Sequence, residues 1–396
     1  MQYNKNTQSA LILALLLSGV LCNAAIIPYI SVYIVETLGE QPRMISLYAL
    51  VTLSLTLVVN RQYGEWIDNG NQIAPLVLVS IAAYAIAVSS ILLSPNYWTL
   101  VCIASPCLAI ANAAVSTMYS FGRLFAERHG LNIQRYNSYL RAMTSLGWMI
   151  APALAFSIAG ILDTWAVFKF ALTLCGFWAL LWLIVMPKNF SQPSTEENSA
   201  TSNTRQAGRN SDLLLATGVC LTFALAHSMS TTALPLFYIK EAGLPTFAPG
   251  LSLSVKTFVE IIAILSSPWI MTKFGLRNAL RVAAVMAICA FAVLSQVTTI
   301  AGMVAGAALE GLYYGLFAAV GLSYVQDFAK GRMARATSLY MNSLFLGGLI
   351  ASPLMGLIAQ FFSFAMAIKL SAFWAVSALL ILTFTQHKRK TQQTTS

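Results

Sequence analysis

Lys256 and Glu260 stand four positions apart inside an apolar run, LSLSVKTFVEIIAIL, which covers residues 251–265. Residues at this spacing share one face of a helix and can reach each other. A cation beside a carboxylate in an apolar segment is costly, and such groups mark ion pathways, proton relays and gates. A neutralised ion pair with a purely structural role is the alternative, and the sequence leaves both open.

Glu310 is the second carboxylate that lies deep in an apolar run, and its own run contains no cation. Proton coupling requires a carboxyl group that gains and loses a proton as its surroundings change between water and a dry site near a cation. Glu260 and Glu310 are therefore rival proton carriers. Lys256 and Arg141 are the cations that could face Glu260, although snorkelling toward the membrane surface explains Arg141 equally well.

The composition around these residues is that of a membrane protein. Of the 396 residues, 58% are hydrophobic and only 9% are charged, against about 25% charged in soluble proteins. Several apolar runs reach the roughly 20 residues that a helix needs to cross a bilayer. The net charge of +10 comes from basic residues that punctuate these runs, which argues for membrane topology and against nucleic-acid binding.

Charges, polar breaks and clusters of Pro, Asn and Gly divide the apolar runs into twelve predicted transmembrane helices. These spans cover residues 9–35, 44–60, 73–93, 98–121, 136–161, 164–186, 212–238, 248–271, 278–297, 299–325, 336–361 and 365–385. The segment 189–211 is rich in Ser, Thr, Asn and Gln and lacks apolar periodicity, as flexible linkers do. We predict an all-α integral membrane fold with six-helix bundles at 1–188 and 212–396, joined by a cytoplasmic linker at 189–211.

The basic residues also predict the orientation. If the N-terminus is cytoplasmic, most of the 23 Lys and Arg residues lie on the cytoplasmic side, whereas only Arg43 and Lys240 lie opposite. Cytoplasmic loops of membrane proteins carry this excess of positive charge. We expect a multi-pass protein of the bacterial inner membrane with both termini in the cytoplasm.

An internal repeat supports the division into two bundles. Pro42 and Pro245 are 203 positions apart, as are Trp66 and Trp269, while Gly147/Gly348 and Pro152/Pro353 are 201 apart. Parallel halves related by an axis along the membrane normal are how the major facilitator fold is built.

The loop between spans 2 and 3 resembles the loop motif of major facilitator proteins. Residues 64–71, GEWIDNGN, keep the spacing of Gly64 and Asp68, while asparagines replace the expected bases. The resemblance implies that Asp68 latches a cytoplasmic gate. A solvated turn is the alternative.

A narrower resemblance extends along nearly the whole chain. The features that carry it are GEQP at 39–42, Asn112, Arg123, the segment from Arg141 to Pro152, Gly243-Leu244-Pro245, Glu260, Gln326-Asp327, Gly331-Arg332 and Asn342-Ser343. Together they resemble the bacterial sugar efflux transporter (SET) family of the major facilitator superfamily. The resemblance implies export of small sugars or glycosides by proton antiport. The chain departs from the family at Ala233, Lys256 and Glu310.

The major facilitator fold implies that spans 1, 4, 7 and 10 line a central cavity and that spans 2, 5, 8 and 11 form the seam between the halves. A sugar needs amides or charged groups for its hydroxyls and an aromatic face for its CH surface. The candidate substrate-binding residues are Asn23, Tyr29, Asn112, His227, Glu310, Tyr313, Tyr314 and Asn342. Ordinary packing is the alternative for each tyrosine, and His227 is either a proton-linked group or a core histidine.

We therefore predict a secondary active transporter that exports small sugars in exchange for protons by alternating access, as a monomer without a cofactor. Its partners are the sugar, protons and the lipid bilayer. The many aromatic residues keep a proton-coupled exporter of amphipathic drugs open. A membrane enzyme or sensor has less support, because the sequence contains no Walker loop, HExxH, GxSxG or metal-ligand cluster.

Overall fold

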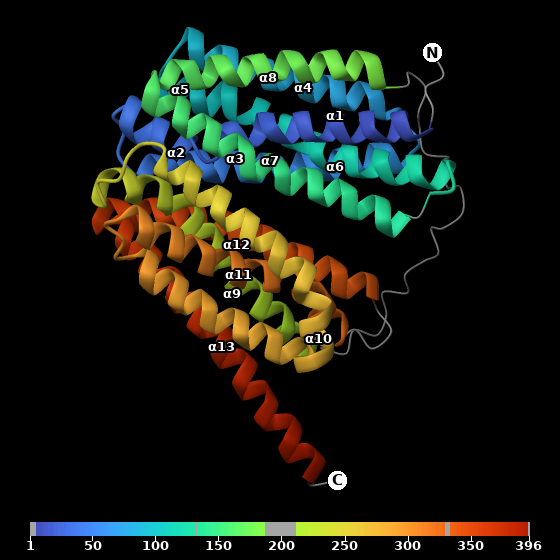
Figure 1. Ribbon diagram of the computed structural model, residues 1–396, viewed down its shortest axis with the longest axis vertical. Coiled ribbons are helices and arrows are strands. Elements are labelled where there is room, and N and C mark those ends of the chain that lie inside the picture. The colour runs from blue at the N-terminus through green and yellow to red at the C-terminus, as the bar shows by residue number, and fades with distance from the viewer. Residues whose placement is uncertain (1–4, 132, 187–210, 329–332, 395–396) are drawn as a thin grey trace. The chain divides into compact units, whose positions relative to one another are not determined.

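The computed structural model describes residues 5–131, 133–186, 211–328 and 333–394, which form helices and no strand (Figure 1). The first half of the chain contains α1 (Lys5–Ile26), α2 (Ile30–Val32), the π-helix η1 (Tyr33–Thr37), α3 (Arg43–Asp68), α4 (Ile73–Leu93), α5 (Tyr97–Thr99), the π-helix η2 (Leu100–Ala104), α6 (Ser105–Arg128), α7 (Ile133–Ile161) and α8 (Thr164–Val185). The second half contains α9 (Ser211–Leu236), the π-helix η3 (Phe237–Glu241), α10 (Ala248–Leu294), α11 (Ile300–Gln326), α12 (Met333–Phe361) and α13 (Phe364–Thr394).

Eleven stretches of helix in the described ranges are long and apolar enough to cross a membrane. One of them, α10, has 47 residues, more than twice the roughly 20 residues that a helix needs to cross a bilayer. Gly275 interrupts it with φ 76° and ψ 159°, a conformation that is essentially restricted to glycine. Read as two spans that meet at Gly275, α10 brings the count to the predicted twelve.

The chain divides into two compact units. The N-terminal unit comprises Met1–Glu40 and Leu47–Asn203, and the C-terminal unit comprises Gln41–Ser46 and Thr204–Ser396. The predicted linker 189–211 lies outside the described residues, apart from Ser211, so its bounds stay a prediction.

In the N-terminal unit, α1 packs against α7 and α8, and α4 packs against α6 and α8. Small residues set the close approaches. A β-carbon at Gly147 of α7 would collide with Val20 of α1, and one at Gly19 would lie 2.8 Å from the buried ring of Trp178. Glycine lets helix backbones approach closely in membranes, so these positions fix how α1 lies against its neighbours.

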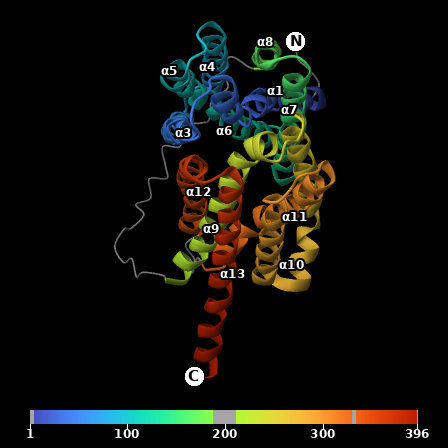
Figure 2. The same cartoon turned by 90° about the vertical axis from the view of Figure 1, so that its left-hand side faces the viewer.

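In the C-terminal unit, α9 packs against α12 and α13, while α10 and α11 lie side by side (Figure 2). Gly347 of α12 lies directly against Ala224 of α9. Gly311 and Gly315 of α11 lie against the backbone of Lys256 and Glu260 in α10.

The two units repeat local features of the backbone. The first long helical segment of each unit ends in a π-helical turn, η1 or η3. A glycine in the left-handed region follows in both, Gly39 with φ 69° and Gly243 with φ 63°. Both α7 and α12 also carry an internal proline, Pro152 and Pro353. The repeat found in the sequence therefore has a counterpart in local structure.

Candidate functional site

The charged side chains that are buried within the described residues are Lys256 and Glu310, with 6% and 1% of their surface exposed. Lys256 lies on α10 and Glu310 on α11. Burying a charge is costly unless it is paired, hydrogen-bonded or neutralised. The surroundings of these two residues therefore define the candidate site.

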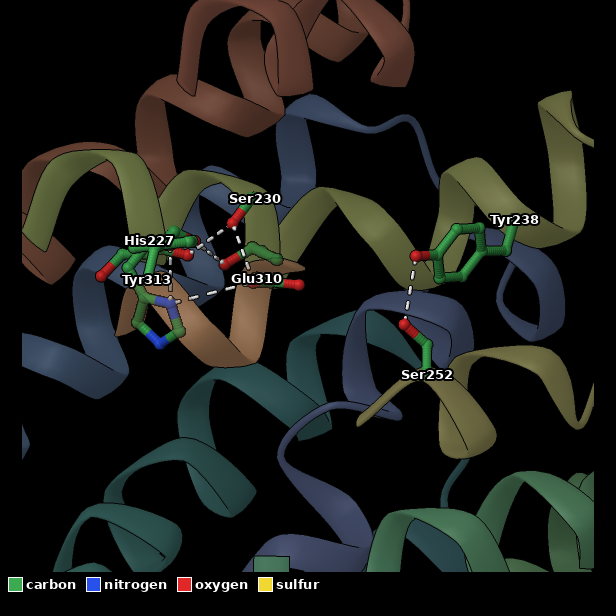
Figure 3. Close-up of polar contacts among 8 residues, drawn as sticks. His227, Ser230, Tyr238, Ser252, Glu310 and Tyr313 are labelled. Carbon is green, nitrogen blue, oxygen red and sulfur yellow. Dashed lines mark hydrogen bonds and ion pairs between the residues drawn. The ribbon is translucent and has the colours of Figure 1, made fainter. Parts of the chain in front are cut away.

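Glu310 faces α9 (Figure 3). The Oγ of Ser230 donates a hydrogen bond to the Glu310 Oε1 at 3.4 Å, and the Nδ1 of His227 lies 3.9 Å from the same oxygen. The hydroxyl of Tyr313 lies 3.4 Å from His227 Nδ1. The carboxyl group is thus held between a hydroxyl and an imidazole, which are groups that can exchange protons with it.

Ser230 suits both protonation states of Glu310. Its Oγ also lies 3.0 Å from the backbone carbonyl of His227. When the hydroxyl donates to that carbonyl, its oxygen can accept a hydrogen bond from a protonated Glu310, and when it turns, it donates to the carboxylate. The site can therefore gain or lose a proton without breaking this contact.

Lys256 lies against an aromatic pair. The rings of His227 and Tyr314 stack with centroids 3.8 Å apart, and the Lys256 Nζ lies 4.7 Å from the centre of the Tyr314 ring. A cation over a ring face is attracted by the ring quadrupole. We call His227, Ser230, Lys256, Glu310, Tyr313 and Tyr314 the Glu310 cluster.

Lys256 and Glu260 do not pair as their spacing suggested. The ion pairs shorter than 4.0 Å in the described part of the chain include neither residue. Helical side chains lean toward the N-terminus of their helix, so a lysine that precedes a glutamate by four residues points away from it. The ammonium group turns to Tyr314 of α11 instead, and Glu260 remains half-buried.

Two glycines bring α11 against α10 at this level. A β-carbon at Gly311 would collide with the backbone carbonyl of Lys256, and one at Gly315 would lie 2.7 Å from the carbonyl of Glu260. Each glycine directly follows a residue of the cluster, Glu310 or Tyr314. The contact therefore fixes both side chains beside α10. The Gly-xxx-Gly spacing was the signal by which the sequence could have revealed this contact.

The match to a known family covers most of the chain. Residues 10–304 match the family model of the Major Facilitator Superfamily. The chain belongs to this superfamily. Its members and the relatives described next are membrane transporters, so this protein is a membrane transporter and not an enzyme.

Curated relatives narrow the resemblance. Sugar efflux transporter A of Dickeya chrysanthemi is 25% identical to this superfamily member over 361 residues, which are 90% of each chain. Sugar efflux transporter C of Escherichia coli strain K12 is 24% identical over 377 residues, 94% of this chain and 93% of the relative. These relatives confirm the resemblance to sugar efflux transporters that the motifs predicted.

Solved structures of other transporters share the fold. A mutant of the nucleoside transporter NupG superimposes with a TM-score of 0.78 at 13% identity, covering 95% of this chain and 99% of that one. A bacterial homologue of the human lysosomal transporter Spinster, in an inward-facing and occupied conformation, gives a TM-score of 0.70 at 11% identity, covering 97% and 96%. The predicted major facilitator fold is confirmed.

Within this major facilitator chain, several predicted substrate residues lie outside the Glu310 cluster. Asn23 is buried in the N-terminal unit, where its Nδ2 donates to the carbonyl of Gly19 at 3.2 Å. Its Oδ1 has no hydrogen-bond partner among the described residues. Asn112 is half-buried on α6, and Asn342 is exposed on α12.

Tyr29 is engaged inside the N-terminal unit of the transporter. Its hydroxyl lies 2.9 Å from the Oγ1 of Thr164, and its ring packs edge-on against Phe156 and Phe168 at 5.4 and 6.2 Å between centroids. Only 2% of the residue is exposed. These contacts fit the packing alternative for this tyrosine.

The two predicted gating residues of the N-terminal unit differ in what the structure describes. Arg141 is exposed on α7. The side chain of Asp68 lies outside the described residues. Gating by either residue stays a prediction.

Proposed function

We propose that this transporter exports small sugars or glycosides in exchange for protons. It works by alternating access, in which the substrate site opens in turn to each side of the membrane. The observation that carries the proposal is Glu310, a carboxyl group with 1% of its surface exposed, in hydrogen-bonding reach of Ser230. The relatives that align with nine-tenths of the chain are sugar efflux transporters, which supports the substrate class and the direction.

Counting charges suggests one proton per transport cycle at this site. The charge of Lys256 acts on both Glu310 and Glu260 and on the ring of His227. One lysine and two carboxylates leave one negative charge in excess, which is costly in a dry interior. A single bound proton neutralises the group. We assign that proton to Glu310, because Glu260 is the more exposed of the two.

Antiport follows if the proton and the sugar use the same carboxyl group. An ionised Glu310 accepts hydrogen bonds from sugar hydroxyls, and protonation removes part of that capacity. The stacked rings of His227 and Tyr314 offer an aromatic surface for the CH face of the sugar. A proton that enters from the outside therefore weakens sugar binding and favours release there, and loss of the proton to the cytoplasm prepares the site for the next sugar.

The N-terminal unit supplies neutral groups in this proposal. Asn23 and Asn112 are amides that can donate to and accept from sugar hydroxyls. Arg141 and Asp68 act at the cytoplasmic gate. The protein lies in a bacterial inner membrane with both chain termini in the cytoplasm, an orientation that the distribution of basic residues supports.

The test is efflux from proteoliposomes of the purified protein, loaded with labelled sugars or with a cationic dye, with and without a pH gradient. We expect gradient-dependent sugar efflux and no dye efflux. Glu310→Gln should lower the rate of uphill sugar transport by about a hundredfold or more, while sugar counterflow continues. Glu310→Asp keeps a carboxyl group at this position, so it is the matched control and should retain gradient-dependent transport. Sugar efflux at the same rate with and without the gradient refutes antiport. Efflux of the dye and not of the sugars means that the substrates are amphipathic drugs.

A further inference from the structure

A small cavity lies beside Glu310, lined by α9, η3, α10 and α11. Its volume is about 10 Å³, which is room for a single water molecule. Four polar side chains line it together with apolar residues: Thr231, Tyr238, Ser252 and Glu310. A buried water needs two to four polar partners, and these residues supply them.

Thr231 gives this cavity unsatisfied hydrogen-bonding capacity. Its Oγ1 is buried and has no hydrogen-bond partner among the described residues. Pro235, four positions later in α9, has no N–H and so cannot bond the backbone carbonyl of Thr231. A buried polar group without a partner costs free energy, so the site favours a molecule that both donates and accepts hydrogen bonds.

The far side of the cavity leads to a pair of hydroxyls at the end of α9. The hydroxyl of Tyr238, in η3, lies 3.1 Å from the Oγ of Ser252, near the start of α10 (Figure 3). Both residues are buried. Glu310 uses its Oε1 for Ser230 and His227, and none of these contacts occupies Oε2. The carboxyl group and the hydroxyl pair thus line the same cavity, which has room for about one water.

We infer that this cavity holds a water molecule that relays protons between Glu310 and the Ser252–Tyr238 pair. The inference rests on the proposed function of Glu310. In the inward step, the hydroxyl oxygen of Tyr238 takes up a proton from outside the site and passes its own proton to the oxygen of Ser252. Ser252 then passes its original proton to the water. The water passes one of its protons to Glu310 Oε2. Each hydroxyl and the water end as they began, and the net change is protonation of the carboxylate.

The relay is one of several influences on Glu310. The titratable groups around it are His227 on α9, Tyr238 in η3, Lys256 and Glu260 on α10, and Tyr313 and Tyr314 on α11. Of these, Tyr238 is the group that lines the same cavity as Glu310. The relay therefore connects Tyr238 with Glu310.

The test compares Thr231→Val with Thr231→Ser in proteoliposomes. Valine keeps the shape of threonine and removes the hydroxyl, so the rate of proton-driven sugar transport should fall about tenfold or more, while counterflow without a gradient is unchanged. Serine should restore the rate. Thr222→Val is the control, because among the described residues the Thr222 hydroxyl bonds its own helix, at the carbonyl of Val219.

A second measurement does not depend on transport. The infrared carbonyl band of protonated Glu310, identified by its absence in Glu310→Gln, should form more slowly after a pH drop in Thr231→Val and in Ser252→Ala. Wild-type rates in both variants overturn the relay. A sodium requirement for transport that Thr231→Val removes also overturns it, because the cavity would then hold a cation. If Glu310→Gln leaves uphill transport intact, the proposed function fails instead.

Discussion

Helix α3 and the first half of α10 begin alike and carry different chemistry. Pro42 precedes α3 as Pro245 precedes α10, 203 positions later. At the same offset, Leu53 and Leu57 of α3 correspond to Lys256 and Glu260 of α10. The scaffold is repeated, whereas the charges occur in one copy.

The facing helices differ in the same way. Asn96 caps α5 and Thr299 caps α11, again 203 positions apart. At that offset, Cys107, Leu108 and Asn112 of α6 take the places of Glu310, Gly311 and Gly315 of α11. The C-terminal unit therefore combines a carboxyl group with close backbone packing, and the N-terminal unit has neither there. At these corresponding positions, the charged side chains therefore lie in the C-terminal unit alone.

The largest effect should come from replacing Gly311 of α11 by leucine, the residue at the corresponding position 108 of α6. In Gly311→Leu, the new side chain would overlap the backbone carbonyl of Lys256, and overpacking costs about 1–3 kcal/mol or more. We expect a lower thermal stability in detergent and no measurable transport. Gly218→Ala is the matched control, because nothing lies within 4 Å of a β-carbon there. Normal stability and transport in Gly311→Leu would show that the close packing is dispensable.

Replacing Lys256 by leucine, the residue at the corresponding position 53 of α3, should change the pH dependence of transport. Lys256→Leu removes the cation that favours the ionised carboxyl groups, so these groups should keep their proton to higher pH. The pH of half-maximal proton-driven sugar transport should rise by about one to three units, with transport recovered in alkaline buffer. Lys256→Arg should stay close to wild type. An unshifted or downward-shifted profile in Lys256→Leu would contradict the electrostatic role of Lys256.

A smaller effect is expected at Tyr314. Tyr314→Leu removes the ring under the Lys256 ammonium, an interaction that contributes about 0.5–2 kcal/mol, and should raise the KM for sugar several-fold. Tyr314→Phe keeps the ring and should retain most of the affinity. Equal KM values in the two variants would mean that the ring face does not matter.

The smallest effect should occur at Tyr29, the packed tyrosine of the N-terminal unit. Tyr29→Phe removes the hydrogen bond to Thr164 and should lower the free energy of unfolding by about 1 kcal/mol. The KM for sugar should not change. An increase in KM without a loss of stability would return Tyr29 to the substrate site.

The spans and the family could be read from the sequence because each depends on local pattern. Apolar runs of the right length and basic residues between them are properties of the chain alone. Even the break in α10 falls between two predicted spans, 248–271 and 278–297, although the structure joins them through Gly275. Local hydropathy was enough for this level of description.

The site itself depends on contacts between helices, which sequence spacing does not specify. Lys256 and Glu260 had the spacing of a pair, but Lys256 meets Tyr314 from another helix. Glu310 had no cation in its own helix, and the side chains that contact its carboxyl group, Ser230 and His227, come from α9. Ser230 was missed because a serine in an apolar helix has no distinctive pattern.

The continuity of α10 at Gly275 has a mechanical consequence. The two spans are joined by one kinked residue with no loop between them, so they have little freedom to move independently. We therefore expect a displacement of Lys256 and Glu260 to move the second half of α10 as well, where the Nη2 of Arg281 donates to the carbonyl of Leu382 on α13 at 3.1 Å. The first half of α10 is in this way connected to the last helix of the chain.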